Sequence, residues 1–592
     1  MSSLTASTRR SMLPAASSSP VAIECDVLVL GSGAAGLAAA VTAAHAGLSV
    51  TVLERDSLIG GTSAISGGAL WIPGTRQAMA GGFKDSIENA RLYLRNVLGG
   101  CYNAELIETF LARGPEALAF LEDNTELKYS MRELSPDYYP EIQGASVNGR
   151  ALEVAEYDGK KLGRYFELLR APPAGMMVFG GMMVNKVDIH HLLNLRKSLE
   201  SFMHCLKLVA RFVRDRLSYS RGTRLVIGNA MVAQLLKSAL DKGVKFHLNA
   251  EPTSFLMSPE NGVQGVVARL SDDMTAHIRA SAGVILATGG LSRNPHVLGD
   301  RPDTGEDHLS MASPNSDGAM IYLAEKLGAQ VGGGLLSNFY WAPMSAAITQ
   351  GGLREIFPHI VTDRAKPGII AVNDKGVRFV NEANSYHRFV EAMRAQLRQG
   401  ASRFYLIADS KALKSYGLGL ARPSPGINTK LVLSGYLIEA PTIAALALRL
   451  DIDSPSTLQT TIDDFNRDAT AGVDHQFQKG ASSYNRSMGD PGASHPCLAP
   501  IAAPPFYAVR IVTGDLGSAK GLVTDAHARV QREDGSIIPG LYAVGSDMNS
   551  VMAGGYPGPG ITLGPGLTFG YIAAKTISEQ AGRVVGAKRS SP

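Results

Sequence analysis

A glycine-rich turn near the start of the chain has the residue types and spacing of a dinucleotide site. Gly31, Gly33 and Gly36 follow the pattern GxGxxG, after an apolar run that predicts a strand and before an alanine-rich run that predicts a helix. Such glycines tighten the turn and let the backbone approach a pyrophosphate, while the helix start offers free N–H groups. Glu54 ends the next predicted strand, where a carboxylate can bind a ribose hydroxyl. The sequence therefore predicts a bound dinucleotide.

Three further turns rich in small residues favour FAD over a nicotinamide cofactor. They run from residue 60 to 68, from 287 to 290 and from 545 to 547, each after a predicted strand. Any one of them alone is equally well explained by ordinary turn chemistry. Ligands of open α/β sheets bind at the carboxyl ends of strands, so four such turns suit a cofactor as extended as FAD, with a nicotinamide dehydrogenase as the alternative. The candidate cofactor-binding residues are Gly31, Ser32, Gly33, Ala34, Ala35, Gly36, Glu54, Arg55, Gly61, Thr62, Ser63, Ser66, Gly67, Gly68, Ala287, Thr288, Gly289, Gly290, Gly545, Ser546, Asp547, Thr562 and Leu563.

The segments that join these turns alternate between strand and helix patterns. One βαβ unit occupies residues 24–31, 34–46 and 48–54, and apolar runs at 283–287 and 541–545 predict further strands of the same sheet. We therefore expect an α/β protein with a Rossmann-like FAD-binding domain, split in sequence by an inserted α+β catalytic (cap) domain. The expected division is a disordered tail at 1–22, FAD-binding segments at 23–348 and 513–585, and a catalytic domain at 349–512.

Composition removes several other classes of protein. A hydrophobic share of 45% against 19% charged residues excludes disorder of the whole chain. A formal net charge of +4 over 592 residues does not indicate a nucleic-acid partner. The four cysteines are scattered with no CxxC pair, which disfavours a disulfide scaffold, a zinc ribbon and an iron–sulfur protein, and we expect no metal. No pattern indicates an oligomeric state.

One segment within a basic helical insertion near 190–220 has an amphipathic pattern. Apolar residues recur at helical spacing with basic residues between them, at Leu192, Leu195, Leu199, Phe202, Leu206, Val209 and Val213. Most helices of this kind bury the apolar stripe against their own protein, and a membrane-surface contact is the alternative. Because the chain also lacks an apolar run of about 18 residues, we expect a cytoplasmic protein, with peripheral membrane contact as the alternative.

Several motifs resemble the fumarate-reductase-like flavoprotein superfamily. They are GSGAAG, LERD, GGTSAISGGALWIPG, LATGG and GLYAVGSD, which begin at residues 31, 53, 60, 286 and 540. Within that superfamily the chain is similar to the 3-ketosteroid Δ1-dehydrogenases, through GYPGPGITLGP at 555–565, RFVNEA at 378–383 and PDYY at 136–139. The resemblance covers nearly the whole chain. It implies FAD-dependent formation of a C1–C2 double bond in a 3-ketosteroid or a related cyclic ketone, with a quinone-like or artificial electron acceptor.

The same resemblance implies a role for each of four residues. The Tyr556 hydroxyl and the Gly560 N–H would form an oxyanion hole for the ketone oxygen, and Tyr386 would take the proton from the adjacent carbon. Tyr138 would assist Tyr386, with Tyr139 as the adjacent alternative. A tyrosine has a reference pKa of about 10, so we expect the rate to climb toward alkaline pH.

Departures from the family pattern leave other activities open. Tyr386 follows a serine where the family commonly has proline, and the stretch from about 172 to 224 is longer than expected. The alternatives are a Δ4-steroid dehydrogenase, a fumarate-reductase-like enoate reductase or another ene-type flavin oxidoreductase, and, outside enzymes, a flavin-bound accessory protein. His190, His191 and His387 receive no role, because histidines in such mixed segments are more often structural.

Overall fold

The computed structural model describes residues 21–582, apart from gaps at 174–175, 196–197, 261, 272–273, 295–306, 349–351, 353 and 424–427. Nearly all of the expected tail at 1–22 lies outside the described residues. None of the described helices is both long enough and apolar enough to cross a bilayer.

The largest sheet has eight strands and a parallel centre, in the order β21-β22-β11-β1-β2-β8. β22, β11, β1, β2 and β8 run parallel, whereas β21 closes one edge and β9 and β10 extend β11 in antiparallel pairing. The bounds are β1 Val21–Leu30, β2 Val50–Leu53, β8 Lys245–His247, β9 Glu251–Ser258, β10 Gly262–Arg269, β11 Thr275–Leu286, β21 Arg529–Gln531 and β22 Ile537–Ala543. Strands from both ends of the described chain therefore build one sheet, which confirms the expected split α/β fold.

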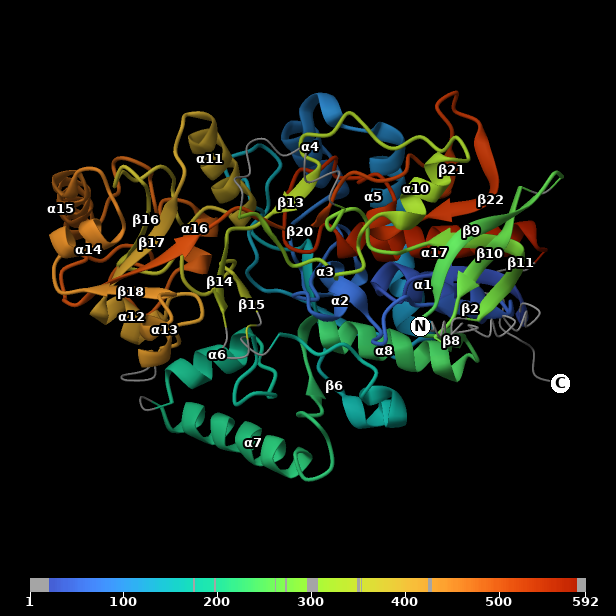
Figure 1. Cartoon of the computed structure of the whole chain (residues 1–592), viewed down its shortest axis with the longest axis horizontal. Coiled ribbons are helices and arrows are strands. Elements are labelled where there is room, and N and C mark those ends of the chain that lie inside the picture. The colour runs from blue at the N-terminus through green and yellow to red at the C-terminus, as the bar shows by residue number, and fades with distance from the viewer. Residues whose placement is uncertain are drawn as a thin grey trace, which may run out of the picture.

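Helices rich in small residues cover this sheet. α1 (Ala34–His45) packs against α8 (Ile227–Asp241) and α17 (Leu563–Gln580), and α17 also contacts α5 (Ala104–Asn124). Figure 1 shows α17 crossing the sheet and α8 running below it. Five of the seven alanines of α1 are buried, so the helix axes approach closely and hold the turn at the start of α1 in place.

A second, antiparallel sheet lies at the opposite end of the molecule, with the order β16-β17-β19-β18 (Figure 1). Its strands bury alternate residues on two faces, one against α11 and the other against α14 and α15. The elements of this part are β16 Ile369–Asn373, β17 Phe404–Asp409, β18 Leu437–Ala440, β19 Phe506–Ile511, α11 Tyr386–Arg398, α12 Ser410–Tyr416, α13 Thr429–Leu433, α14 Ile443–Arg449, α15 Pro455–Ala471 and α16 Ser483–Met488. The domain bounds at 349 and 512 stay a prediction.

The remaining elements surround the two large sheets, and β13, β14, β15 and β20 lie between them (Figure 1). The remaining strands are β3 Leu70–Trp71, β4 Tyr129–Met131, β5 Ala151–Val154, β6 Tyr157–Asp158, β7 Arg224–Leu225, β12 Leu309–Ser310, β13 Phe339–Trp341, β14 Met344–Ile348, β15 Arg354–Pro358 and β20 Gly514–Ser518. The remaining helices are α2 Gly61–Ala64, α3 Arg76–Ala80, α4 Ile87–Leu98, α6 Lys186–Leu193, α7 Leu199–Asp215 and α10 Ala319–Glu325, with 3₁₀ turns η1 Gly99–Cys101, η2 Gly159–Phe166 and η4 Gly545–Asp547.

The structure of the segment near 190–220 differs from the expected amphipathic helix in two ways. It is divided between α6 and α7, and α7 lies at the lower margin of the molecule in Figure 1. The expectation that its apolar stripe is buried is wrong, because Leu199, Phe202 and Leu206 are 77%, 48% and 50% exposed. The side that faces the protein is instead partly polar, since Ser201 and Asp215 are buried there.

Candidate active site

The turn between β1 and α1 needs glycine at position 31. Gly31 has φ +108°, and a Cβ there would lie 2.2 Å from the Ala287 carbonyl oxygen. Gly33 precedes α1 in an extended conformation and has no side chain of its own to cap the helix start. The first turn of α1 therefore keeps N–H groups that a phosphate can accept from, as the sequence predicts for a dinucleotide.

A buried carboxylate, Glu54, fixes the shape of this turn. One of its oxygens accepts hydrogen bonds from the backbone N–H and the hydroxyl of Ser32, at 3.0 and 2.5 Å. The neighbouring Arg55 points to two other carboxylates, Asp317 at 2.6 Å and Glu251 at 2.8 Å. Of this predicted pair, the structure places Glu54 at the turn, whereas Arg55 belongs to an ion-pair cluster.

The other predicted turns lie against the same region. The hydroxyl of Ser63 accepts a hydrogen bond from the Ala34 N–H at 3.0 Å, which joins the turn before β3 to the start of α1. Added Cβ atoms at Gly61 and Gly67 would meet no heavy atom within 4 Å, so the backbone there faces open space. Such a small-residue wall can pass close to an extended ligand.

Asp547 connects the turns that follow β11 and β22. Its carboxylate accepts hydrogen bonds from the N–H and the hydroxyl of Thr288, at 2.5 and 2.8 Å, and from the Gly290 N–H at 2.8 Å. Burial raises the pKa of Asp547, and these hydrogen bonds oppose that effect by stabilising the charged form. Two predicted turns that are distant in sequence are thus held as one surface.

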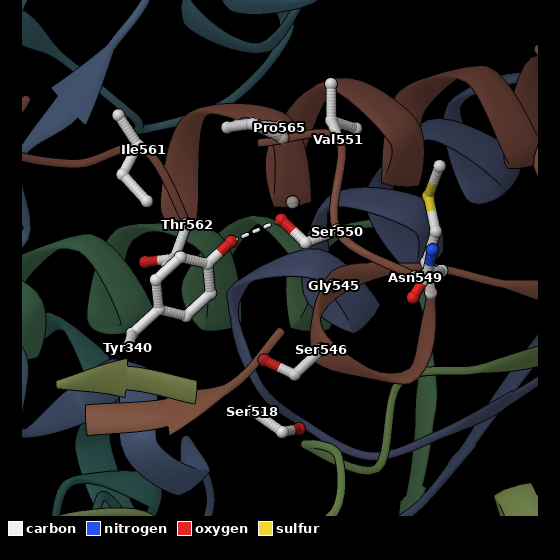
Figure 2. A pocket seen from close by; sticks show the side chains of 12 residues that line it. Tyr340, Ser518, Gly545, Ser546, Asn549, Ser550, Val551, Ile561, Thr562 and Pro565 are labelled. Atoms are coloured by element: carbon white, nitrogen blue, oxygen red, sulfur yellow. Dashed lines mark hydrogen bonds between the residues drawn. The ribbon is translucent and has the colours of Figure 1, made fainter. Parts of the chain in front are cut away.

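A pocket lies between η4 and the start of α17. Figure 2 shows Ser518 and Ser546 on one side of it, Thr562 and Pro565 on another, and the Tyr340 hydroxyl close to Ser550. No side chain caps the N-terminus of α17, so its N–H groups favour an electron-rich group in this pocket. Together with the turn at α1, these residues fit the chemistry of FAD, because N–H groups at α1 would suit a pyrophosphate and those at α17 an electron-rich ring.

Three predicted tyrosines meet beside this pocket, although they come from distant parts of the chain. Tyr138 lies in the loop between β4 and β5, Tyr386 is the first residue of α11, and Tyr556 precedes α17. The Tyr138 hydroxyl donates to the Tyr386 hydroxyl at 3.1 Å. The ring of Tyr556 stacks on Tyr138 with centroids 5.4 Å apart and meets the edge of Tyr386 at 5.0 Å. All three side chains are nearly inaccessible to water.

Burial controls the ionisation of the cluster. It raises the pKa of Tyr386 well above its usual value, and the neighbouring Tyr138 and Tyr556 raise it further. It also raises the pKa of Tyr138 strongly, and that of Tyr556 to about 12, an effect that the Tyr386 hydroxyl partly opposes. All three phenols are therefore neutral at pH 7, and a phenolate at any of them needs help from the surroundings.

The loop from Tyr556 to Gly560 is held rigidly against β3. The Pro557 carbonyl accepts a hydrogen bond from the Tyr138 N–H at 2.9 Å and another from the Tyr93 hydroxyl at 2.7 Å. Gly560 has φ +100°, and a Cβ there would lie 2.4 Å from the Ala69 carbonyl oxygen. The loop thus needs glycine at 560, and it ties Tyr138 and Tyr556 together through the backbone.

Asp137 fixes the direction of the neighbouring Tyr138. Its carboxylate accepts from the Trp71 indole N–H at 2.8 Å and pairs with Arg150 at 2.7 Å. Burial raises the pKa of Asp137 to about 6, although Arg150 and these hydrogen bonds oppose it. Tyr139, the adjacent candidate, lies instead under the Arg388 guanidinium at 5.2 Å. The geometry therefore brings Tyr138, rather than Tyr139, into the cluster.

The chain is similar to known proteins over most of its length. The family model described as "FAD binding domain" matches residues 26–563. The 3-oxosteroid 1-dehydrogenase of Mycolicibacterium smegmatis is 36% identical over 94% of this chain and 98% of its own. A 3-ketosteroid delta1-dehydrogenase from Sterolibacterium denitrificans, solved in complex with 1,4-androstadiene-3,17-dione, has a TM-score of 0.86 at 33% identity, over 94% of this chain and all of its own.

This chain belongs to the FAD-dependent 3-ketosteroid Δ1-dehydrogenase family. It is therefore an FAD-dependent oxidoreductase, and the prediction of FAD over a nicotinamide cofactor is confirmed. Another relative is named for a monocyclic compound. It is the 4-oxocyclohex-2-ene-1-carboxylate 5-dehydrogenase of Sinomonas cyclohexanicum, which is 37% identical over 94% of both chains.

Two further tyrosines of this dehydrogenase surround the cluster and were missed from the sequence. Tyr340 meets the ring of Tyr556 edge-on at 5.4 Å, and Tyr484 meets the ring of Tyr138 edge-on at 5.0 Å. Neither lies in a recognisable motif, and the only signal is that both are aromatic. His387, which received no role, is buried with its ring centroid 5.6 Å from that of Tyr556. Burial lowers the pKa of His387 to about 3, so this side chain is neutral. The described residues contain no cluster of three metal-ligating side chains.

Proposed function

We propose that this flavoenzyme removes two hydrogens from the carbon–carbon bond beside the ketone of a 3-ketosteroid, which introduces a C1–C2 double bond. The observation that carries this proposal is the contact among three buried hydroxyl-bearing rings, Tyr138, Tyr386 and Tyr556, beside the pocket between η4 and α17. A ketone that enters such a cluster meets hydroxyl donors in a dry environment, where each hydrogen bond is strong.

The roles follow from the chemistry of the step. The Tyr556 hydroxyl and the Gly560 N–H hold the ketone oxygen, where negative charge develops. Deprotonated Tyr386 forms an O–H bond with the proton of the adjacent carbon, and the electron pair of the broken C–H bond moves toward the oxygen. Tyr138 assists Tyr386 through the hydrogen bond that joins their hydroxyls at 3.1 Å, which holds the Tyr386 oxygen in place. FAD, when bound, would supply the acceptor for the hydride of the next carbon, and the electron pair held at the oxygen would return to form the C1–C2 double bond.

A monocyclic ketone is the second candidate substrate, and the relative from Sinomonas cyclohexanicum favours it. The dehydrogenation beside the ketone is the same for a monocyclic ketone and for a steroid with four rings. What differs is the remainder of the substrate, which is apolar in a steroid and ends in a carboxylate in an oxocyclohexane carboxylate. The proposal for steroids therefore depends on binding of the remote rings.

Anaerobic mixing of the FAD-loaded enzyme with each substrate tests this function. A saturated 3-ketosteroid should bleach the visible absorption of the flavin in a single turnover, and the product should carry the C1–C2 double bond by mass and ultraviolet spectrum. 4-Oxocyclohexanecarboxylate serves as the matched small substrate. Bleaching by the small ketone alone would transfer the proposal to monocyclic substrates, and bleaching by neither would reject the function.

We also propose a quinone-like electron acceptor and a contact of α7 with the surface of an anionic membrane. The apolar stripe of α7 is open to solvent at Leu199, Phe202, Leu206 and Val213, and Phe179 is 66% exposed. Phe179 belongs to a turn that lies beside α7, since Gly181 approaches the ring of Phe212. A contiguous exposed apolar surface on a folded protein commonly marks an interaction site.

The charges on α7 favour a lipid surface over a second protein. Lys207, Arg214 and Arg216 are exposed and border the apolar stripe, as in helices that lie in the interface of anionic bilayers. The acid Asp215 is turned inward, where its carboxylate accepts a hydrogen bond from the Thr223 N–H at 2.9 Å. Steroids and quinones both partition into lipid, so a membrane contact would place the enzyme beside both of its proposed reactants.

Flotation of the FAD-loaded enzyme with lipid vesicles tests this contact. The enzyme should float with vesicles that contain phosphatidylserine and much less with pure phosphatidylcholine or at high salt. The double variant Phe202→Ser/Leu206→Ser should lose roughly 10- to 100-fold in affinity for each residue removed from lipid. Leu448→Ser on α14 is the matched control, because that side chain is also exposed, at 68%. Failure to float, with a dimeric mass in solution, would assign the stripe to a second copy of the chain.

A further inference from the structure

A buried guanidinium, Arg364, lies behind the tyrosine cluster with hydrogen bonds to carbonyl oxygens only. Its side chain donates to the carbonyls of His359 at 2.6 Å, Glu382 at 2.8 Å and Asn384 at 3.1 Å, with a longer contact to Ile360. Arg364 is 4% exposed, and it forms no ion pair with any carboxylate of the described residues. Its charge is thus desolvated and not neutralised by direct contact, which is a costly arrangement.

The carboxylates nearest to Arg364 are already bound to other partners. Asp363 pairs with His359 at 2.5 Å, and Glu382 pairs with Arg378 at 2.9 Å and lies 3.7 Å from Lys479. Burial lowers the pKa of Arg364, while Tyr484, Asp363, Glu382 and Tyr138 oppose this by favouring its charged form. The positive charge of Arg364 therefore acts on the tyrosines beside it, Tyr484 and Tyr138.

Two of the carbonyls that Arg364 binds stand immediately before Tyr386. Glu382 and Asn384 form the turn that leads into α11, and Ser385 caps that helix by accepting from the Arg388 N–H. Arg364 also lies over the ring of Phe389, one turn into α11, at 4.9 Å. Through these contacts one side chain sets both the position and the direction of the Tyr386 phenol.

The positive charge of Arg364 acts on the tyrosines beside the proposed base. Arg364 lowers the pKa of Tyr484, and its own charged form is favoured by Tyr138, which donates to Tyr386 at 3.1 Å. The other groups that act on Tyr138 and Tyr386 are Tyr556, which is neutral, and Arg132, which acts on Tyr138. His387 beside Tyr556 is neutral as well.

We propose that Arg364 is a positioning residue of the proposed dehydrogenation: it holds the turn before Tyr386 and supplies the buried positive charge that lets the Tyr138–Tyr386 pair carry a phenolate. This inference rests on the proposed function of Tyr386 as the base. Arg364 acts through the backbone at 382–384 and through the local electric field.

The test compares Arg364→Met with Arg364→Lys by the pH profile of flavin reduction in single-turnover mixing. Methionine removes the charge, so the alkaline rise in rate should move upward by about one pH unit or more, a roughly tenfold loss at any pH below it. Lysine keeps the charge but cannot bridge both carbonyls, so the rate should fall about tenfold while the rise stays at the wild-type pH. Arg388→Met on the same helix, whose arginine pairs with Glu141 at the surface, is the control with an unchanged profile.

Each outcome decides the inference separately from the function. An unshifted profile for Arg364→Met in protein that retains its flavin would overturn the charge role, and a wild-type rate for Arg364→Lys would overturn the positioning role. If Arg364→Met does not fold, Arg364→Lys decides the positioning role, and Arg364→Gln, which also removes the charge, decides the charge role by the same upward shift of the profile. Full activity in Tyr386→Phe would instead reject the proposed function itself.

Discussion

The tyrosine cluster and helix α7 depart in opposite ways from the usual partition of a protein. In the cluster, the hydroxyl-bearing rings of Tyr138, Tyr386 and Tyr556 are sealed from water. In α7, apolar side chains such as Phe202 and Leu206 face solvent while the acid Asp215 is buried. Most folds bury apolar groups and expose polar ones, because that arrangement lowers the free energy of the folded chain.

The comparison separates two kinds of site. One kind works by excluding water, and the other works because a partner can contact it. Burial of the phenols raises their pKa values and strengthens every hydrogen bond that a bound ketone would form. Exposure of the α7 stripe gives nothing to the stability of the isolated chain, but it leaves apolar area that a lipid surface can cover. The two regions should therefore respond to mutation in different measurements: the cluster in the rate, and α7 in binding.

Removal of the proposed base should have the largest effect. Tyr386→Phe keeps the ring, and its contacts with Tyr138 and Tyr556, but loses the hydroxyl that accepts the proton. A positioned general base is worth about 10²- to 10⁴-fold, so flavin reduction by a 3-ketosteroid should slow by that factor in stopped-flow mixing. The flavin spectrum before mixing is the control for cofactor binding. A rate within threefold of wild type would show that the burial of this phenol serves packing alone.

Loss of the proposed oxyanion donor should have the next largest effect. Tyr556→Phe removes one hydroxyl donor, while the loop from 556 to 560 keeps its backbone hydrogen bonds to Tyr138 and Tyr93. The loss of one such donor costs about 2.7–4 kcal/mol of barrier, or 100- to 1,000-fold in rate. Steady-state and single-turnover rates should fall together, with the flavin still bound. An equal effect from Tyr340→Phe would move the donor role from Tyr556 to its neighbour.

Local backbone chemistry explains what could be predicted from the sequence. Gly31 to Gly36 predicts a cofactor turn because a tight turn and a close approach impose glycine at fixed spacing. The contact between Tyr138 and Tyr386 joins residues 248 apart, so it could be expected only through resemblance to a family. Arg364 gave no signal, because its partners are main-chain carbonyls that every residue type supplies.

The orientation of α7 could not be predicted for a different reason. A stripe of apolar residues at helical spacing is the same pattern whether it faces a core or the outside. The inward side of this helix is decided by polar contacts, such as His204 with Asp188 at 2.8 Å and Ser201 with His191 at 3.0 Å. These contacts depend on which segments meet in the fold, and periodicity alone contains no information about that.

The pH response should distinguish the cluster from the rest of the molecule. Because the pKa of Tyr386 is raised, the reactive phenolate is scarce at pH 7, and the rate of flavin reduction should climb by up to about tenfold per pH unit. Stability should respond in the opposite direction. Unfolded tyrosines lose their protons near pH 10 while the buried ones retain theirs, so the unfolded state binds fewer protons and the free energy of unfolding falls as pH rises above about 10.

Rates and urea unfolding measured from pH 6 to 11 check both signs. Tyr386→Phe should weaken the loss of stability above about pH 10, because one raised phenol is gone. A rate that is flat across this range would remove Tyr386 from the role of base.

The smallest expected effect is on the stability of α7. Phe202 and Leu206 are about half exposed, so the double variant Phe202→Ser/Leu206→Ser should change the free energy of unfolding by no more than about 0.5 kcal/mol per site, as surface substitutions usually do. Urea unfolding without lipid measures this. Phe110→Ala, at a side chain with no exposed area in α5, is the contrasting variant and should cost about 3–5 kcal/mol. A comparable cost in α7 would mean that the stripe packs against the enzyme in solution, and vesicle binding would then have to displace it.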